Sequence, residues 1–329
     1  MNIWKNKVIF ITGANGFLGA HLVKRALSYK AKVIVLIKEN IRFSLFEIEE
    51  LGSKCKIYQG DLSNSKLIKS IFQDNKIDVC FHIAAQAIVG VANNSPLGTF
   101  KANIEGTWNM LEAARVFGIK AMVVASSDKA YGEHKRLPYK EEAPLIALHP
   151  YDASKSCADI LSRTYAHTYK LPIAVTRCAN IYGPGDFNFS RIIPDTCRLV
   201  IKDKNPIIRS DGTPLRDYVF VEDVVDAYFV LAKSLLNKKI NFGEAFNFGI
   251  GKPISVIGLV RIILKISKKT GLTPKILSKG KIKGEIDKQY LSSVKARNIL
   301  GWRPKYSIQR GLEITYKWYK NHLYEILKK

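Results

Sequence analysis

The chain has 329 residues, of which 47% are hydrophobic, which suits one large or two smaller α/β domains with a substantial core. No apolar run approaches the ~20 residues of a membrane-spanning helix, and the five cysteines form no Cys-x-x-Cys pair, so we expect a cytoplasmic protein without a membrane span, a disulfide framework or a metal site. The formal net charge is +24, but Lys and Arg are scattered without a block of five, so nucleic-acid binding is not expected and the basic surface is expected to attract a small anionic ligand.

The first half of the chain alternates short β-branched runs with stretches of helical periodicity. Buried strands are predicted at residues 8–11, 32–37, 55–59, 78–83, 120–125 and 172–177. Helices are predicted up to residue 28 and at residues 64–72, 96–117 and 150–169. Strands that alternate with helices make βαβ units, so residues 1–177 are expected to form a doubly wound parallel sheet of the α/β class.

The pattern changes after Arg177, because Pro and Gly residues break the rest of the chain into short elements. Residues 178–329 are therefore expected to form mainly a smaller, irregular, substrate-binding domain. A further strand at 218–221 and a helix at 222–233 are predicted inside it, and we expect residues 218–248 to return to the first domain. A final helix is predicted at 312–327, with an aromatic and apolar stripe that packs against the protein.

Three glycines follow the first predicted strand at a regular spacing. Gly13, Gly16 and Gly19 form Gly-x-x-Gly-x-x-Gly between that strand and the first helix. Glycine lets the backbone turn tightly and approach a pyrophosphate, which then lies at the helix N-terminus. The strand before the motif and the helix after it favour a dinucleotide site over a plain tight turn. The domain of residues 1–177 is therefore predicted to be a dinucleotide-binding Rossmann domain.

The end of the second predicted strand leaves the choice of dinucleotide open. An acid at this point would hold the ribose of NAD, and Glu39 is a candidate. Lys38 and Arg42 are equally placed to bind the 2′-phosphate of NADP. Asp61 ends the third strand, where its carboxylate can accept from adenine.

Two short segments carry the candidate catalytic groups. Ser127, Asp128 and Lys129 follow the strand at 120–125, and ligands bind at such strand ends in open α/β sheets. Tyr151 and Lys155 are four residues apart, which places them on one face of a helix. A nearby ammonium favours the phenolate, so the Tyr151 pKa is expected to fall and the phenol to remove a proton from a sugar hydroxyl. The segments together predict oxidation of an alcohol and a second acid/base step.

These motifs resemble the extended short-chain dehydrogenase/reductase family, the nucleotide-sugar epimerases and dehydratases. The matching segments span essentially the whole chain and are Thr12-Gly13-x-x-Gly16-x-x-Gly19, Gly60-Asp61-Leu62, His82-Ile83-Ala84-Ala85-Gln86, Asn103-x-x-Gly106-Thr107, Tyr151-x-x-x-Lys155 and Arg216-Asp217-Tyr218-Val219. Within the family, the chain most resembles the CDP-glucose 4,6-dehydratases. That likeness is carried by Ser127-Asp128-Lys129, Tyr151 to Asp159, Asn180-Ile181-Tyr182-Gly183, Asn188 to Pro194, Ile208 to Thr213 and Gln289-Tyr290-Leu291.

The resemblance implies a set of binding residues and a homodimer. The residues implied to bind NAD are Gly13, Asn15, Gly16, Phe17, Leu18, Gly19, Asp61, Leu62, Ala84, Ala85, Gln86, Asn103, Tyr151 and Lys155. The residues implied to bind the nucleotide sugar are Asn180, Ser190, Arg191 and Arg216. The planar guanidinium forks of the two arginines suit phosphate oxygens. The helices at 96–117 and 150–169 match those that form a dimer interface in the family. His82 is interpreted as a structural residue at a strand end.

The implied reaction is a 4,6-dehydration. Tyr151 would take the proton of the sugar 4-hydroxyl while Ser127 orients that oxygen, and hydride would pass from C4 to the nicotinamide. Asp128 would then protonate the departing 6-hydroxyl, and Lys129, if neutral, would remove the C5 proton. Hydride return to C6 would give a 4-keto-6-deoxy sugar, a precursor for deoxysugar and polysaccharide synthesis. The alternatives are a 4-epimerase, a 5,6-dehydratase and, more remotely, a non-catalytic basic Rossmann protein.

Overall fold

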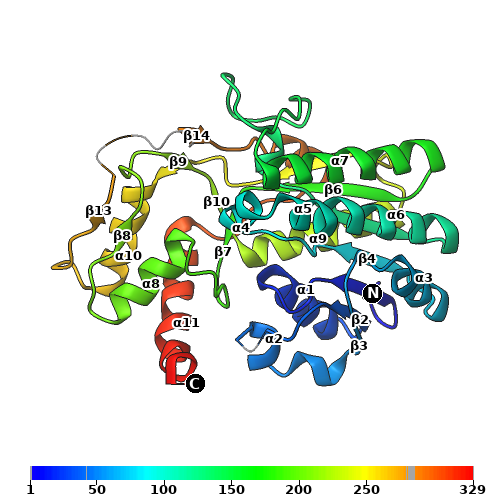
Figure 1. Cartoon of the computed structure of the whole chain (residues 1–329), viewed down its shortest axis with the longest axis horizontal. Helices are drawn as coiled ribbons and strands as arrows, with labels where there is room; N and C mark the ends of the chain where they lie inside the picture. Colours follow the sequence, from blue (N-terminus) through cyan, green and yellow to red (C-terminus); the bar gives the residue numbers. More distant parts are fainter. Residues whose placement is uncertain (1, 42, 279, 281–285, 329) are drawn as a thin grey trace.

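The computed structural model describes residues 2–41, 43–278, 280 and 286–328, and its elements form two lobes that lie side by side in Figure 1. The first lobe is a seven-stranded parallel sheet in the order β11-β6-β5-β4-β1-β2-β3. Its strands are β1 (Val8–Thr12), β2 (Lys32–Ile37), β3 (Lys56–Gln59), β4 (Val79–His82), β5 (Ala121–Ala125), β6 (Ile173–Cys178) and β11 (Ala245–Phe248). The doubly wound α/β fold predicted from the sequence is thus confirmed.

Helices cover both faces of this sheet because successive strand residues point to opposite sides. Ile9 and Ile11 pack on one face in a core with helices α1 and α9, whereas Phe10 between them packs on the other face with α3, α6 and α7. The bounds of these helices are α1 Phe17–Ser28, α3 Ser65–Asp74, α6 Gly106–Phe117, α7 Pro150–Tyr169 and α9 Val221–Leu236. The continuous apolar runs of the strands follow from this burial on two sides.

Two predicted elements differ from the structure in helix type or in strand pairing. The helix predicted at 96–117 consists of α5 (Pro96–Phe100), a π-helical turn η2 (Lys101–Glu105) and α6. The strand predicted at 218–221 is β10 (Tyr218–Phe220), which pairs with β7 (Asn180–Tyr182) instead of joining the large sheet. The seventh strand of that sheet is β11, beside β6, and was not predicted. Helix α9 does pack against β5 and β6 of the first lobe.

The second lobe has its own apolar core between α8 (Ile192–Ile201), α10 (Val256–Ser267) and α11 (Ile308–Lys328). The final helix therefore begins four residues before the predicted position, 308 against 312. The short strands of this lobe are β8 (Ile207–Ile208), β9 (Leu215–Arg216), β12 (Ile254–Ser255), β13 (Lys275–Ile276) and β14 (Lys288–Gln289). The remaining short elements are α2 (Leu45–Ile48), η1 (Leu51–Lys54), α4 (Val89–Asn94), η3 (Asp128–Tyr131) and η4 (Ala296–Leu300).

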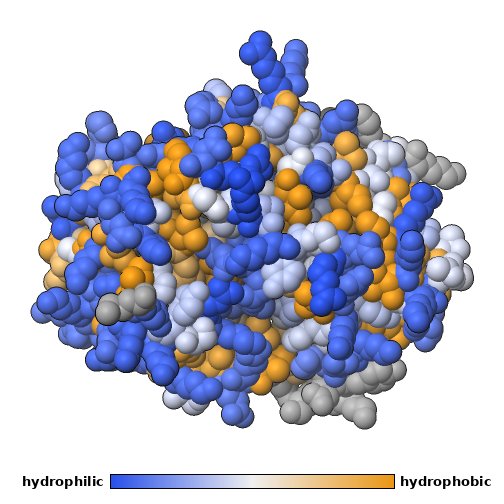
Figure 2. Space-filling model, turned by 180° about the vertical axis from the view of Figure 1, so that it is seen from behind, coloured by the Kyte–Doolittle hydropathy of each residue, from blue (hydrophilic) through white to orange (hydrophobic). Residues whose placement is uncertain are grey.

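The surface matches the scattered charge of the sequence. Figure 2 shows a face on which hydrophilic side chains predominate and hydrophobic side chains occur in separate groups between them. Within the described residues, no helix is both long and apolar enough to cross a membrane.

Candidate active site

A cavity of about 1150 Å³ collects nearly all the site residues predicted from the sequence. Its lining combines the glycine-rich turn (residues 12–19), the Ser127 turn (residues 127–131), the start of α7 and parts of the second lobe. The turns follow the carboxyl ends of β1 and β5, which is where ligands bind in open α/β sheets. Of the predicted residues, Asn103 alone is not among those that line the cavity within the described chain.

The glycine-rich turn brings backbone close to backbone. Gly13 has a φ of +70°, and a Cβ there would lie 2.8 Å from Ala84 Cα. A Cβ on Gly19 would lie 2.1 Å from the carbonyl oxygen of Gly13, so only glycine fits. Helix α1 begins at Phe17 with no acidic residue in its first turn, so its N–H groups and dipole can meet an anion. These features fit the pyrophosphate of a dinucleotide.

The side chains expected at the adenosine end are held by local contacts. Lys38 and Asp61 form an ion pair with an Nζ–Oδ2 distance of 3.0 Å, and Asp61 Oδ1 accepts from the Ser63 N–H and Oγ–H. Asn15 donates to the carbonyl oxygen of Glu39 at 2.7 Å. Lys38, Glu39 and Asp61 all line the cavity, and Arg42 lies outside the described residues.

Asn103 lies behind the cofactor loop in the π-helical turn η2. Its Oδ1 accepts from the backbone N–H of Gln86 at 2.7 Å, and its Nδ2 donates to the Gln86 carbonyl at 3.0 Å and to Ser154 Oγ at 2.8 Å. Asn103 therefore braces the loop after β4 against α7 instead of facing the cavity. The π-helical turn gives Asn103 this position. The sequence predicted a regular helix over 96–117 and therefore did not predict this turn.

His82 fits the structural interpretation. Its ring lies between Thr12 Oγ1, 2.9 Å from Nδ1, and Thr107 Oγ1, 3.1 Å from Nε2. Burial lowers the pKa of the imidazole to about 3, with the positive charge of Lys155 acting in the same direction. His82 is therefore a neutral ring that links β4 to β1 and α6.

Tyr151 and Lys155 lie in the first two turns of α7, which begins at Pro150. Lys155 Nζ donates to the carbonyl oxygen of Ala125 at 2.7 Å, and burial lowers the pKa of this ammonium to about 8. Burial raises the pKa of the Tyr151 phenol to about 12, against a lowering by its hydrogen bond with Ser127. The predicted fall in the Tyr151 pKa is therefore wrong for the protein alone, because the ammonium is turned to a strand carbonyl and desolvation dominates.

Asp128 is the buried carboxyl of the Ser127 turn. Its Oδ1 accepts from Ser127 Oγ at 3.2 Å, and its Oδ2 has no hydrogen-bond partner among the described residues. Burial raises the pKa of this carboxyl, although the neighbouring positive charge of Lys129 opposes the shift. Both side chains line the cavity, and Lys129 is only half-buried. A carboxyl in this setting is suited to hold a proton and donate it.

The second lobe contributes polar and cationic side chains to the same cavity. Arg191 Nη1 pairs with Asp186 Oδ2 at 2.9 Å, and Ser190 Oγ donates to Asn188 Oδ1 at 2.6 Å. Asn180 and Arg216 also line the cavity: Asn180 donates to the Asp217 carbonyl at 3.1 Å, and Arg216 donates to the Leu215 carbonyl at 3.0 Å. These four predicted residues are thus gathered at one site.

Comparisons with known proteins agree with this geometry. Residues 9–249 match the model of the NAD dependent epimerase/dehydratase family, which is well over half of the chain. The chain belongs to this family. It is 26% identical to the dTDP-D-glucose 4,6-dehydratase of Homo sapiens over 97% of this chain and 91% of that protein. It is 30% identical to the UDP-glucuronate 4-epimerase of Thermodesulfobacterium geofontis over 97% of each chain.

A solved structure supports the fold and the cofactor. The dTDP-glucose 4,6-dehydratase from Bacillus anthracis, in complex with NAD, superposes with a TM-score of 0.85 at 26% identity, covering 97% of this chain and 98% of that one. The chain is an enzyme of the NAD dependent epimerase/dehydratase family, and its cofactor is NAD. The glycine-rich turn fits this cofactor, because its backbone leaves room for the pyrophosphate.

Two residues that the sequence did not single out for the site also lie at or behind it. Tyr228, from α9, lines the cavity, and its hydroxyl lies 2.9 Å from Thr176 Oγ1. Gln289, from β14, donates its Nε2 to the Asp128 carbonyl at 3.2 Å and is fully buried. A tyrosine in an amphipathic helix gives the same pattern as a core residue, so Tyr228 had no distinct signal. Gln289 stood in a motif that carried the resemblance, but its contact with the Ser127 turn depends on tertiary structure.

Proposed function

We propose that this enzyme is a nucleotide-sugar 4,6-dehydratase with CDP-glucose as its preferred substrate. It would convert the sugar to the 4-keto-6-deoxy form. The observation that carries the proposal is the Asp128 carboxyl, which is buried, has a free Oδ2 among the described residues and lines the same cavity as Tyr151. Elimination of water needs a second acid at the 6-hydroxyl, and a 4-epimerisation has no step that uses one.

The oxidation half of the reaction rests on three residues of the first lobe. Tyr151 removes the proton of the 4-hydroxyl, and Ser127, its hydrogen-bond partner, orients the same oxygen. The Lys155 ammonium adds a positive charge near the reacting groups. When bound, NAD supplies the hydride acceptor for C4 and the hydride that returns to C6, and its positively charged ring lowers the pKa of an adjacent phenol.

The elimination half uses the Ser127 turn. A ketone at C4 acidifies the hydrogen on C5, so a modest base suffices to remove it. Lys129, half-buried beside Asp128 and lining the same cavity, is the residue placed to take this proton. Asp128 gives its proton to the departing 6-hydroxyl, so water leaves rather than hydroxide. When hydride adds at C6, the base returns a proton, exchanged with solvent, to C5.

The proposed binding residues divide between the two lobes. NAD is held by the glycine-rich turn, by Asp61 and Leu62, and by the loop Ala84 to Gln86, all of which line the cavity. The diphosphate is bound by Arg191 and Arg216, with Asn180 and Ser190 beside them. In this proposal, residues 1–177 together with 218–248 form the cofactor domain, and the other residues of 178–329 form the substrate domain.

The choice of CDP rests on one local feature. Asp128 is followed by Lys129, the pair typical of the CDP-glucose subgroup that the chain resembles. The two relatives are named for dTDP- and UDP-sugars. The nucleobase must therefore be decided by comparing substrates that differ only in the nucleotide.

A 4-epimerase is the second candidate. The Thermodesulfobacterium relative at 30% identity is named as one, and Tyr151, Lys155 and the NAD site would serve that reaction unchanged. Under this reading the side chains of Asp128 and Lys129 would take no part in the chemistry.

The test is incubation of the purified protein with NAD and CDP-, GDP-, UDP- and dTDP-glucose in deuterated water, with mass read by mass spectrometry and configuration and deuterium position read by NMR. Loss of water with one deuterium gained at C5 supports the dehydratase and identifies its nucleotide. A change of configuration without loss of mass supports the epimerase. The matched variant Asp128→Asn should lose elimination by about 10²–10⁴-fold if Asp128 is the acid, and should retain full activity under the epimerase reading.

The proposal includes a cytoplasmic homodimer. Helices α6 and α7 contact each other, and large apolar side chains on α5, α6 and α7 are exposed, among them Leu97, Trp108 and Ile160. Pairing this face with a second copy would remove these side chains from water. Light scattering of the wild type and of Trp108→Glu tests it, and a wild-type mass of one chain would contradict it.

A further inference from the structure

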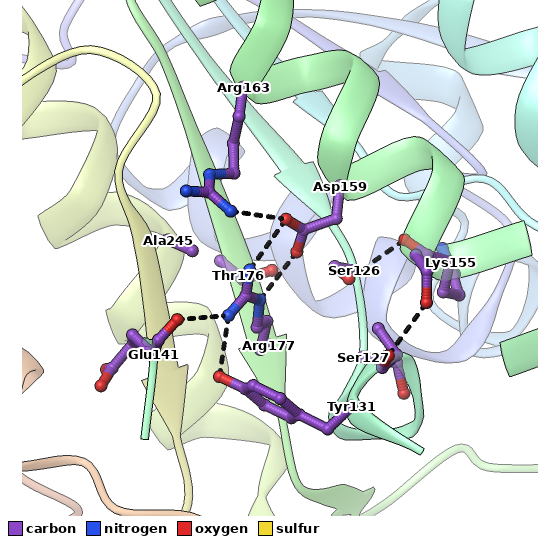
Figure 3. A network of polar contacts seen from close by, with 12 residues as sticks. Ser126, Ser127, Tyr131, Glu141, Lys155, Asp159, Arg163, Thr176, Arg177 and Ala245 are labelled. Carbon is purple, nitrogen blue, oxygen red and sulfur yellow. Dashed lines mark hydrogen bonds and ion pairs between the residues drawn. The ribbon is translucent and has the colours of Figure 1, made fainter. Parts of the chain in front are cut away.

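A buried arginine lies behind the Ser127 turn. Arg177, at the end of β6, and Asp159, on α7, are both 0% exposed, and neither lines the cavity among the described residues. Arg177 Nε donates to Asp159 Oδ2 at 2.8 Å and Nη2 donates to Oδ1 at 2.9 Å, a bidentate pair. Figure 3 shows the guanidinium between Asp159 on one side and Tyr131 on the other. A charge buried this deeply is retained only when it is fully paired.

The remaining donor of Arg177 reaches the Ser127 turn. Nη1 donates to the Tyr131 hydroxyl at 2.9 Å and to the Glu141 carbonyl at 3.0 Å, and the guanidinium carbon lies 4.9 Å from the centre of the Tyr131 ring. The Tyr131 hydroxyl in turn donates a hydrogen bond to Asn247 Oδ1 at 2.8 Å. Tyr131 is the last residue of η3, the 3₁₀ turn that begins at Asp128. Asp128, Lys129 and Tyr131 thus belong to a single 3₁₀ turn, so contacts that hold Tyr131 also restrain the turn that carries the other two.

The other end of the pair holds the helix that carries Tyr151. Asp159 follows Lys155 by four residues and Tyr151 by eight, so the three lie along one face of α7. Ser156 adds a second link between α7 and the Ser127 turn, because its Oγ donates to the Ala130 carbonyl at 2.9 Å. The guanidinium fork thus joins the two segments that carry the proposed oxidation and elimination groups. A bidentate Arg–carboxylate pair fixes orientation as well as distance.

We propose that the Arg177–Asp159 pair, acting through the Tyr131 hydroxyl, is a positioning device that sets Asp128 and Lys129 against the sugar held by Tyr151. The inference rests on the proposed dehydratase function. Neither member of the pair touches the cavity, so both are positioning residues and not catalytic residues. Buried ion pairs are weak contributors to stability, which leaves orientation as the property that this pair provides.

The test variant is Tyr131→Phe, which keeps the ring and removes the hydroxyl. It is compared with wild type in the full-length NAD enzyme, with CDP-glucose and dTDP-glucose as probes. We expect water loss to slow by about 10–100-fold, as for a displacement near 1 Å, with KM changed less than about threefold. Because Tyr151 still oxidises C4, reduced nicotinamide should accumulate, seen by its absorbance. A defect that is merely structural would lower oxidation and elimination together.

Controls separate this inference from its premise. Tyr316→Phe removes one hydroxyl from a buried tyrosine of the core between α8, α10 and α11 and should leave both half-reactions unchanged. Arg177→Lys keeps the charge but loses the fork, and should reproduce the accumulation of reduced nicotinamide; it carries the test if Tyr131→Phe fails to fold. Equal rates of water loss in wild type and both variants would overturn the positioning role alone. A wild type that never loses water would overturn the proposed function and this inference with it.

Discussion

The glycine-rich turn and the loop of residues 186–191 line one cavity, but they are built in different ways. The turn depends on backbone: Gly13 and Gly19 allow close approaches that any Cβ would prevent, and the N-terminus of α1 follows directly. The loop depends on side chains, because Asp186 holds Arg191 and Asn188 holds Ser190. Backbone geometry recognises what all dinucleotides share, whereas side chains can be exchanged without disturbing the fold. Under the proposed function, the first lobe would hold the fixed cofactor and the second lobe a variable sugar nucleotide.

The largest effect is expected where the two parts meet, at Tyr151. Tyr151→Phe removes the group that takes the 4-hydroxyl proton, so turnover should fall by at least about 10³-fold. NAD and nucleotide sugar should still bind, because the ring remains. Turnover by mass spectrometry and binding by calorimetry measure the two separately, and retained turnover would exclude Tyr151 as the base.

A defect confined to the cofactor part should follow Gly19→Ala. The new Cβ would lie 2.1 Å from the Gly13 carbonyl oxygen, which forces the turn apart. We expect the Kd for NAD to rise by about 10²-fold, the usual size for a 1 Å misplacement at a binding site. Gly271→Ala is the matched control, because a Cβ there meets nothing within 4 Å. Equal NAD affinity in the two variants would contradict the backbone argument.

A defect confined to the substrate part should follow Arg191→Ala. Loss of one phosphate contact should raise KM for the nucleotide sugar by about 10-fold, because a charge-assisted hydrogen bond contributes about 1.5–3 kcal/mol. The Kd for NAD should not change. Arg310→Ala, an exposed arginine paired with Glu313 on α11, is the control. An effect of Arg191→Ala on NAD binding would show that the two parts are not independent.

The smallest effect is a pH dependence of stability that originates at Lys155. Its pKa is lowered from 10.5 to about 8 in the folded protein. Between these pH values only the unfolded chain keeps the proton, so the free energy of unfolding should rise with pH, by about 1 kcal/mol from pH 8 to about 9. Denaturant melts of wild type and Lys155→Met at both pH values measure this contribution. A rise of the same size in the variant would assign it to other groups.

The regular lobe was predictable because its signals are local. Apolar runs gave the strands β1 to β6 to within a residue at most ends, and the glycine spacing gave the turn before α1. The four-residue strand β11 was missed because Ala245 to Phe248 follow a region of broken pattern and pair only with a distant strand, β6. The two-residue strands of the second lobe have no periodicity to detect.

The sequence predicted which residues line the candidate site better than it predicted their contacts and pKa values. The residues gathered around one cavity, but Asn103 turned out to brace the Gln86 loop from behind. The ionisation of Tyr151 was predicted with the wrong direction, because spacing shows that an ammonium is near and says nothing about burial or about the carbonyl of Ala125 that takes its hydrogen bond. Desolvation is a property of the assembled fold.

The position of β11 also decides how the chain can be divided. The strand that completes the large sheet follows residues 178–217, which contribute α8, β8 and β9 to the other lobe. Helix α9, which covers β5 and β6, comes from the same late part of the sequence. A fragment that stops at residue 177 would therefore leave β6 as an open edge with an uncovered apolar face, a template for aggregation. Residues 178–217 are in this sense an insertion within a sheet that closes late, and they can diverge in length and sequence while the sheet stays whole.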